Sequence, residues 1–259
     1  MAEKKLKDWF DKELAELLST KIAEKFPSFD KKSFISDVEQ GVQDLQLKAR
    51  LSVFSNNLKT YLPSNYGDAI SILISILGEE NQKETGMFTE YYWVMPIAKF
   101  VEEHGLENFD ESIKAIAEIT KRNTGEYAIR QYLKAYPDQT LKIMTQWSLD
   151  KNFHLRRLAS EGSRSRLPWA SKLDMFIDDP QLLLPILDNL KDDPIKFVQK
   201  SVANSLNDIL KDNYNFAMSV LQGWAVNASK ERSWIIKHAL RKQVKDGNPE
   251  AIELRKLVI

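Results

Sequence analysis

The chain has 259 residues, of which 43% are hydrophobic and 29% are charged, so it is long enough to bury a core and has the composition of a globular protein. It contains no cysteine, which excludes disulfide bonds, thiolate zinc sites and cysteine nucleophiles. Its formal net charge at pH 7 is +0, which taken alone does not indicate a polyanionic partner.

The N-terminus lacks the signature of an exported protein. Residues 1–10 are charged from position 3 onward and have no apolar core of the kind found in a signal peptide. No window approaches the roughly 18 consecutive apolar residues of a membrane-spanning helix. We therefore expect a cytoplasmic protein with no membrane partner.

The first third of the chain has the apolar spacing of amphipathic helices. We predict helices over residues 8–25, 34–46, 48–62 and 69–77. The run Pro-Ser-Asn-Tyr-Gly at 63–67 predicts a turn, and the polar stretch 79–86 predicts a loop. Alternating β-branched runs bounded by turns do not appear, so the predicted fold class is all-α.

Three later segments share a pattern that indicates a helical repeat. In each, an aromatic residue is followed by an aliphatic residue, basic residues and then alanine; the segments are 153–159, 197–203 and 234–239. The equivalent residues Leu155, Val198 and Ile235 are 43 and 37 positions apart, near the HEAT period of about 40–47. Residues 126–130 resemble an earlier, more compact copy.

This repeat predicts a right-handed α-solenoid of HEAT-like repeats, because a single helix pair cannot bury its own apolar face. We expect one domain over residues 1–259, with N-terminal repeats in 1–88 and a functional groove in 89–259. The second helix of each pair should line a concave surface. The basic residues that such a surface would align are Arg130, Arg156, Arg157, Lys200, Lys237 and Arg241.

Charge is distributed unevenly along the chain. The balance of Lys and Arg against Asp and Glu is −7 for residues 1–113, +6 for 114–170 and +1 for 171–259. A basic middle segment in a neutral protein favours an anionic partner, although a solvated face accounts for it equally well. A basic stripe on a concave helical surface suits the phosphate backbone of duplex DNA.

The segment 154–170 has the densest concentration of functional residue types. It holds four arginines, the single acid Glu161 and the single tryptophan Trp169. Gly162 predicts the end of a helix, and Pro168 lies in a following loop that presents Trp169. Glu161 is either a salt-bridge partner of these arginines or a functional carboxylate.

Two further acids lie near the other repeat segments. Glu126 precedes Arg130, and Asp208 lies ten residues after Val198, so it shares the face of Val198 if that helix continues. The alternative for Asp208 is a helix C-terminal acid or a solvent-facing acid. Three carboxylates also suit Mg²⁺, but four nearby arginines would compete for them, so we expect neither a metal nor an organic cofactor.

At these residues the sequence resembles the AlkC-type DNA alkylation-repair glycosylases, relatives of AlkD in the HEAT-like-repeat superfamily. The resemblance covers essentially the whole chain. It departs from the family at Ser165, where proline is usual, and at Gln199-Lys200, where two arginines are usual. Because no β-rich segment precedes Ile259, the chain resembles the shorter branch without an immunoglobulin-like domain. The matching segments are 94–96, 104–106, 119–130, 156–162, 166–169, 190–193, 201–204, 206–208 and 238–241.

The resemblance implies a monomeric, cofactor-independent glycosylase that hydrolyses the N-glycosidic bond of cationic alkylated bases in double-stranded DNA. It implies that the groove carboxylates stabilise the positive charge that develops on the deoxyribose and orient water. The implied catalytic residues are Glu126, Glu161, Asp208 and Trp169. The implied DNA-binding residues are Arg122, Arg130, Arg156, Arg157, Arg164, Arg166, Lys200, Lys237 and Arg241. The alternative function is a non-catalytic HEAT-like scaffold that binds DNA or a protein.

Overall fold

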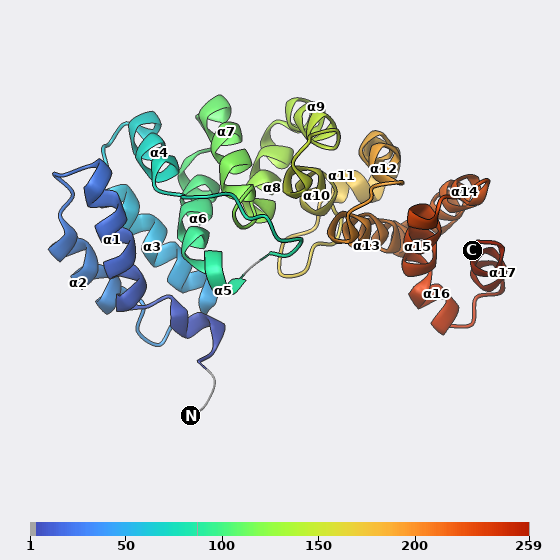
Figure 1. Cartoon of the computed structure of the whole chain (residues 1–259), viewed down its shortest axis with the longest axis horizontal. Coiled ribbons are helices and arrows are strands. Elements are labelled where there is room, and N and C mark those ends of the chain that lie inside the picture. Colours follow the sequence, from blue (N-terminus) through green and yellow to red (C-terminus); the bar gives the residue numbers. More distant parts are fainter. Residues whose placement is uncertain (1–3, 87, 259) are drawn as a thin grey trace. The chain divides into compact units, whose positions relative to one another are not determined.

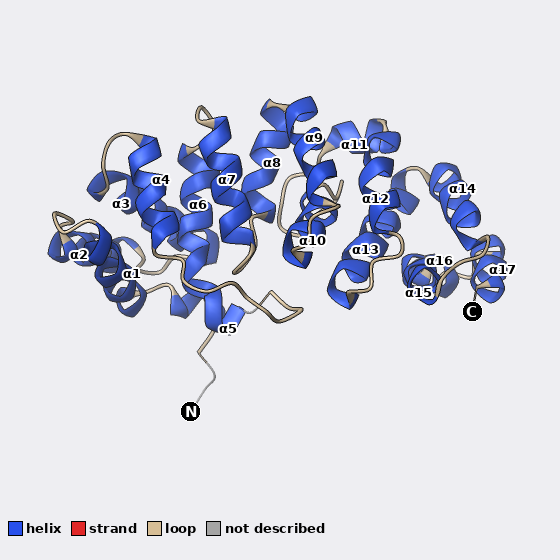
Figure 2. Cartoon of the chain, turned by 45° about the horizontal axis from the view of Figure 1, so that its top comes forward, coloured by secondary structure: helices blue, strands red, loops and turns tan. Residues whose placement is uncertain are grey.

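The structure is a computed structural model that describes residues 4–86 and 88–258, and all its regular elements in these ranges are helices (Figure 2). The predicted all-α class is confirmed. Contacts divide the chain into two compact units, with the boundary between Tyr132 and Leu133, inside one continuous helix. Within the described ranges, none of the helices has both the length and the apolar character needed to cross a membrane.

Unit 1 begins with helices that start at capping side chains. Asp11, Asp30 and Asn65 each accept a hydrogen bond from the backbone N–H three residues further on, which satisfies a donor of the first helical turn. The predicted loop at 79–86 is confirmed as non-helical. The helices of unit 1 are α1 (Lys12–Lys25), α2 (Lys31–Gly41), α3 (Leu47–Tyr61), α4 (Tyr66–Ser75), α5 (Phe88–Tyr91), α6 (Met95–His104) and α7 (Phe109–Thr120), followed by α8 (Glu126–Ala135), which continues across the boundary.

The helices of unit 1 pack in two rows. In one row α1 contacts α4, and α4 contacts α7; in the other, α2 contacts α3, and α3 contacts α6 (Figure 1). The pairs α1–α2 and α6–α7 connect the rows. Apolar side chains such as Phe54, Leu73 and Phe100 are buried between them, which is how amphipathic helices satisfy their apolar faces.

Unit 2 repeats this arrangement. The predicted repeat segments lie in α10, α13 and α15, and these helices pack side by side, α10 on α13 and α13 on α15, while α9 contacts α12 (Figure 1). The helices of unit 2 are α9 (Pro137–Trp147), α10 (Phe153–Gly162), α11 (Asp174–Asp178), α12 (Leu184–Leu190), α13 (Lys196–Asp212), α14 (Tyr214–Ala225), α15 (Lys230–Ala239), α16 (Arg241–Lys245) and α17 (Pro249–Leu257).

The central helix of unit 2 is α13, which contacts α10, α12, α14 and α15. Because it is surrounded, α13 buries polar residues as well as apolar ones, among them Ser201 and Asp208. Buried polar groups require partners, since burial without a hydrogen bond is unfavourable. The helix runs unbroken from Lys196 to Asp212, so Asp208 belongs to the same helix as Val198, as predicted.

Candidate functional site

The loop between α10 and α11, residues 163–173, carries much of the candidate site. Helix α10 ends at Gly162, as predicted, and Ser163 caps it. The backbone N–H of Leu173 donates to the carbonyl oxygen of Ser165 at 3.1 Å, which closes the loop at its base. The ammonium group of Lys134 donates to the Ser171 hydroxyl at 2.6 Å and ties the loop to the end of α8.

Arg164, the second residue of this loop, bridges two of the predicted carboxylates. Its Nη1 donates to Oε1 of Glu161 at 2.7 Å, and its Nε donates to Oδ2 of Asp208 at 2.8 Å. The exposed fractions are 6% for Glu161, 2% for Asp208 and 8% for Arg164, so the network is nearly buried. One guanidinium therefore fixes the relative positions of an acid from α10 and an acid from α13.

The charges around Glu161 keep it ionised. Burial alone would raise the pKa of Glu161, but the positive charges of Arg157 and Arg164 and a hydrogen bond from Ser201 outweigh burial and lower this pKa below its ordinary value of 4.5. Oε2 of Glu161 lies 3.8 Å from Nη2 of Arg157. The guanidinium of Arg157 lies over the Phe197 ring at 4.4 Å, which holds the arginine in place.

Asp208 has a second cation. The Nζ of Lys211 donates to Oδ1 of Asp208 at 2.8 Å, so each oxygen of this carboxylate accepts a charge-assisted hydrogen bond. Asp212, the residue after Lys211 on α13, pairs with Arg166, whose Nε donates to Oδ2 of Asp212 at 2.7 Å. The solvent-facing alternative for Asp208 is therefore wrong, because its side chain is enclosed by cations.

Trp169 has an unusual backbone and an unusual exposure. Its φ is 61°, in the left-handed region that a bulky residue rarely adopts. Trp169 is 79% exposed, although large aromatic side chains are ordinarily buried in folded proteins. The loop thus presents an aromatic residue to solvent, as predicted, in a conformation that costs folding free energy. Strain of this kind concentrates at functional sites.

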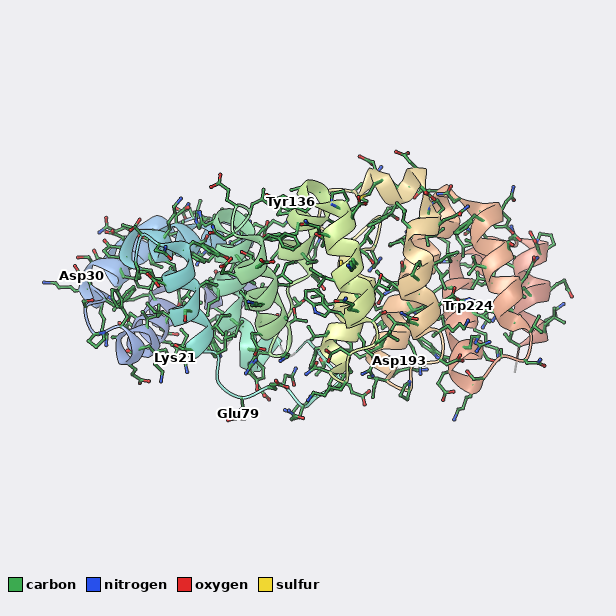
Figure 3. The ribbon with its side chains drawn as sticks, turned by 90° about the horizontal axis from the view of Figure 1, so that it is seen from above. Lys21, Asp30, Glu79, Tyr136, Asp193 and Trp224 are labelled. Atoms are coloured by element: carbon green, nitrogen blue, oxygen red, sulfur yellow. The ribbon has the colours of Figure 1, made fainter. Side chains whose placement is uncertain are left out.

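Arg156 and Arg166, two of the predicted DNA-binding residues, form ion pairs within the protein. Nε of Arg156 donates to Oδ2 of Asp193 at 2.6 Å, and its Nη1 donates to the carbonyl oxygen of Asp150 at 2.9 Å. Asp193, labelled in Figure 3, lies in the segment that leads into α13. Arg156 and Arg166 therefore join loops to helices, and their predicted contact with DNA stays a prediction.

Three of the predicted site residues, Glu126, Arg122 and Arg130, belong to unit 1. Glu126 begins α8, and its Oε2 accepts a hydrogen bond from the Thr124 hydroxyl at 3.1 Å. Arg122 donates through Nη2 to the carbonyl oxygen of Gly78 at 2.8 Å, which anchors the following loop to the end of α7. Arg130 is 2% exposed and fills the interior. These arginines support the fold of unit 1, and their role in binding stays a prediction.

Three predicted cations of unit 2 have no acidic partner. Among the described residues, no carboxylate lies within 4.0 Å of the charged nitrogens of Lys200, Lys237 or Arg241. Arg241 is held instead by uncharged groups, since its Nη2 donates to Oδ1 of Asn204 at 2.8 Å and its Nη1 donates to the carbonyl oxygen of His238 at 2.6 Å. These charges are available to an external anion.

A comparison with known proteins assigns the family. Residues 11–242 match the sequence model of the DNA alkylation repair enzyme family. The chain belongs to this family. It is 35% identical over 250 residues to the protein YhaZ of Bacillus subtilis (strain 168), a match that covers 96% of this chain and 67% of YhaZ.

A solved structure is also similar to this DNA alkylation repair enzyme. It is the alkylpurine DNA glycosylase AlkC of Pseudomonas fluorescens, bound to DNA that contains an abasic site analog. The TM-score is 0.89 at 34% identity, and the match covers 98% of this chain and 68% of that one. The predicted HEAT-like repeat fold and the predicted AlkC-type family are confirmed.

The repair enzyme has site residues that sequence analysis missed. Lys211 and Ser201 support Asp208 and Glu161, and Asp212 pairs with Arg166. A signal for Lys211 was present, because a lysine three positions after an acid on one helix lies within ion-pair reach. No local signal identified Ser201, which meets Glu161 only because α10 packs against α13.

In the repair enzyme, Glu161 and Asp208 form ion pairs with a basic side chain of the same chain. Within residues 4–86 and 88–258, no three His, Asp or Glu side chains gather in a way that could hold a metal ion. Glu161 and Asp208 share Arg164, so Glu161 is a salt-bridge partner of an arginine, which is one of the two alternatives left open for it by the sequence. The same contact suits a functional carboxylate, because a buried acid with an arginine beside it remains charged.

Proposed function

We propose that this protein is a monofunctional DNA glycosylase that hydrolyses the N-glycosidic bond of cationic alkylated bases in duplex DNA. The observation that carries the proposal is the carboxylate pair, Glu161 and Asp208, held by Arg164 in the loop that exposes Trp169. The family and the AlkC likeness support the same activity. We further propose that the protein acts in the cytoplasm, where it meets its DNA substrate, and that it acts as a monomer.

The chemistry that the proposal requires is electrostatic. A base alkylated on a ring nitrogen carries positive charge and leaves without protonation, so the barrier lies in the positive charge that develops on the deoxyribose. Negative charge fixed near this sugar stabilises the transition state without further reorganisation. Glu161 and Asp208 supply that charge in unit 2, and we propose Glu126 as a third carboxylate from unit 1.

We assign the orientation of the attacking water to Glu161. Its Oε1 accepts a hydrogen bond from Arg164, its carboxylate also accepts one from the uncharged Ser201 hydroxyl, and Oε2 lies 3.8 Å from Nη2 of Arg157, beyond hydrogen-bond distance. Both oxygens of Asp208 are bound, by Arg164 and Lys211, so Asp208 is better suited to stabilising charge. A carboxylate that accepts one charge-assisted hydrogen bond rather than two keeps more of its basicity, so it can accept a proton from water as the bond to the base breaks.

DNA binding in the proposal uses two kinds of group. Lys200, Lys237 and Arg241 have no acidic partner among the residues that the structure describes, and they would bind backbone phosphates. Trp169 would lie against the nucleotide and add a stacking surface of about 1–3 kcal/mol. Direct phosphate contact by Arg122, Arg130, Arg156, Arg157, Arg164 and Arg166 is a further part of the proposal.

Timed release of methylated bases from duplex DNA tests this function. The wild type should release them, and Glu161→Gln and Asp208→Asn should each reduce the single-turnover rate by at least about 100-fold, equivalent to about 2.7 kcal/mol of transition-state stabilisation. Glu253→Gln, a change to an exposed acid of α17, is the matched control and should retain the wild-type rate. Undiminished release by both active-site variants would overturn the mechanism. Duplex binding with no release by the wild type would favour the scaffold alternative.

A further inference from the structure

A group of basic residues lies where α13, α15 and α16 meet. We call Lys196, Lys200, His238 and Arg241 the α13–α16 cluster. Lys196 and Lys200 are one helical turn apart, so they share a face of α13, which packs against α15. His238 lies near the end of α15, and Arg241 begins α16.

Uncharged groups hold the cluster in place. The Nζ of Lys196 lies 3.4 Å from the centre of the Trp234 ring, and the ring of His238 stacks on the same tryptophan, with centroids 4.7 Å apart and planes 13° from parallel. The Nη2 of Arg241 donates to Asn204 Oδ1. The positions of these side chains are therefore defined before any ligand arrives.

The cluster differs from the cations around the carboxylate pair in its lack of neutralisation. Arg156, Arg164, Arg166 and Lys211 each pair with an aspartate or glutamate. In the described part of the chain, no member of the α13–α16 cluster has a carboxylate within ion-pair distance. Adjacent like charges destabilise the folded chain, and an anion bound between them removes that cost.

His238 faces charges of one sign. Burial, followed by the positive charges of Arg241, Lys200 and Lys196, lowers the pKa of His238 from 6.5 to about 4. Lys200 and Lys196 approach from α13 and Arg241 from α16, whereas α14, which also packs against α15, has no charged residue. Burial and these neighbouring charges together keep the imidazole neutral down to a pH of about 4.

We propose that the α13–α16 cluster is a proton-linked phosphate site, in which binding of a DNA backbone phosphate is accompanied by uptake of a proton on His238. The proposal rests on the proposed function, which makes duplex DNA the ligand. A phosphate between Lys200 and Arg241 offsets the repulsion that, together with burial, keeps the imidazole neutral. It also accepts a hydrogen bond from the protonated ring, so the charged form becomes the favoured one.

Proximity to the carboxylate pair favours DNA as the source of the phosphate. Burial lowers the pKa of Arg241, the charge of Arg164 lowers it further, and the charge of Asp208 opposes these effects. Arg241 thus lies within electrostatic reach of the residues proposed to act on the deoxyribose. A DNA strand whose phosphate binds at the cluster would pass the carboxylates. An acidic peptide has no chemical group that requires contact with them.

The sign of the linkage follows from the two protonation states. If His238 has a higher pKa in the complex than in the free protein, the complex holds more protons, and affinity rises as the pH falls through the pKa of the complex. One proton changes affinity by at most about tenfold per pH unit. Above the pKa of the complex, His238 contributes no pH dependence.

Fluorescence anisotropy with an undamaged duplex, at constant ionic strength from about pH 7.5 to about pH 5.5, tests the site. We expect the wild-type affinity to increase about threefold or more beyond the increase shown by His238→Gln. His104→Gln, which changes a half-buried histidine of unit 1 whose pKa burial likewise lowers, should keep the wild-type slope. Equal slopes for the wild type and His238→Gln would overturn the proposal.

Titration of the His238 imidazole by NMR gives a second test that needs no variant at this position. Duplex DNA should move its pKa from about 4 toward 6.5, and Lys200→Gln, a surface change, should raise it in the free protein. An unchanged value with the duplex bound would overturn the linkage. Base release by the wild type separates the outcomes: release without linkage removes only this inference, whereas no duplex binding and no release remove the proposed function as well.

Discussion

The Nε of Arg164 lies 2.8 Å from Oδ2 of Asp208, although 44 positions separate these residues in the chain. The same guanidinium holds Glu161, so its removal leaves two buried acids with less compensation. Because an uncompensated buried charge is costly, Arg164→Gln should lower the free energy of unfolding by about 3 kcal/mol. Arg164→Lys keeps the positive charge but loses the planar guanidinium with its several donor nitrogens, so it should lose less stability than Arg164→Gln.

Activity should separate these two variants further. We expect Arg164→Lys to reduce single-turnover base release by at least about tenfold under conditions where it is folded, because an ammonium group cannot hold both acids in one geometry. Arg232→Gln removes a pair with Asp192 at the surface of unit 2 and is the control, with an expected loss of at most about 1 kcal/mol and no loss of rate. Wild-type rates from Arg164→Lys would show that the bridge is dispensable.

The stability of the protein should depend on pH through Glu161. Its pKa is lower in the folded chain than the ordinary value of 4.5, so the stability from its ionised form is fully present above that value and is lost as the pH falls through the lowered one. Arg157→Gln and Ser201→Ala remove stabilising partners, so their loss of stability should begin at a higher pH. Urea unfolding at several pH values measures this.

The control for this titration is Lys256→Gln, which removes an exposed pair with Glu253 and should keep the wild-type pH profile. If Arg157→Gln and Ser201→Ala lose the same stability at every pH, their contribution does not act through the charge of Glu161.

Substitutions of Trp169 should uncouple stability from activity. Its left-handed φ of 61° suits glycine, whereas alanine retains the steric cost. Trp169→Gly should therefore be more stable than Trp169→Ala by about 1 kcal/mol, while both reduce base release by about tenfold or more through the loss of stacking. Thermal unfolding and single-turnover assays measure the two effects. Equal stability of the two variants would indicate that the backbone at 169 carries no strain.

The salt dependence of duplex binding should distinguish free cations from paired ones. Lys237→Gln should weaken binding and reduce the magnitude of the slope of log K against log salt by about 0.9, the value for one lost phosphate contact. Arg232→Gln should leave the slope unchanged, because Asp192 already neutralises this arginine. A slope reduced equally by both variants would mean that Arg232 leaves Asp192 when DNA binds.

The fold was predictable because its signals are local. Apolar spacing and the recurrence of Leu155, Val198 and Ile235 identified helices and a repeat. Helix starts were less accurate, since a cap overrides apolar spacing: Asp11 begins α1 at Lys12, where the apolar pattern began at residue 8. The boundary inside α8 had no sequence signal, because the residues on both sides continue one amphipathic helix.

The site was predictable in its residue types and unpredictable in its pairings. Sequence analysis found Glu161, Asp208 and a surplus of arginines, but not which arginine each acid would meet. Those choices depend on contacts across some 40 residues, such as that of Arg156 with Asp193, and on how far each helix is buried. The positive φ of Trp169 was likewise hidden, because no glycine or asparagine marks the position.

The pairing of Arg164 and Lys211 with the carboxylate pair also affects the encounter with DNA. Unmasked acids would repel an approaching polyanion and slow its association. Here Glu161 and Asp208 are screened at short range by cations of the same unit, while Lys200 and Arg241 have no carboxylate at ion-pair distance in the described part of the chain, so we expect the long-range field over α13 and α15 to attract DNA. The negative charge of these acids then acts on DNA only at contact distance. As a result, different residues determine the rate of association with DNA and the rate of the reaction at the deoxyribose.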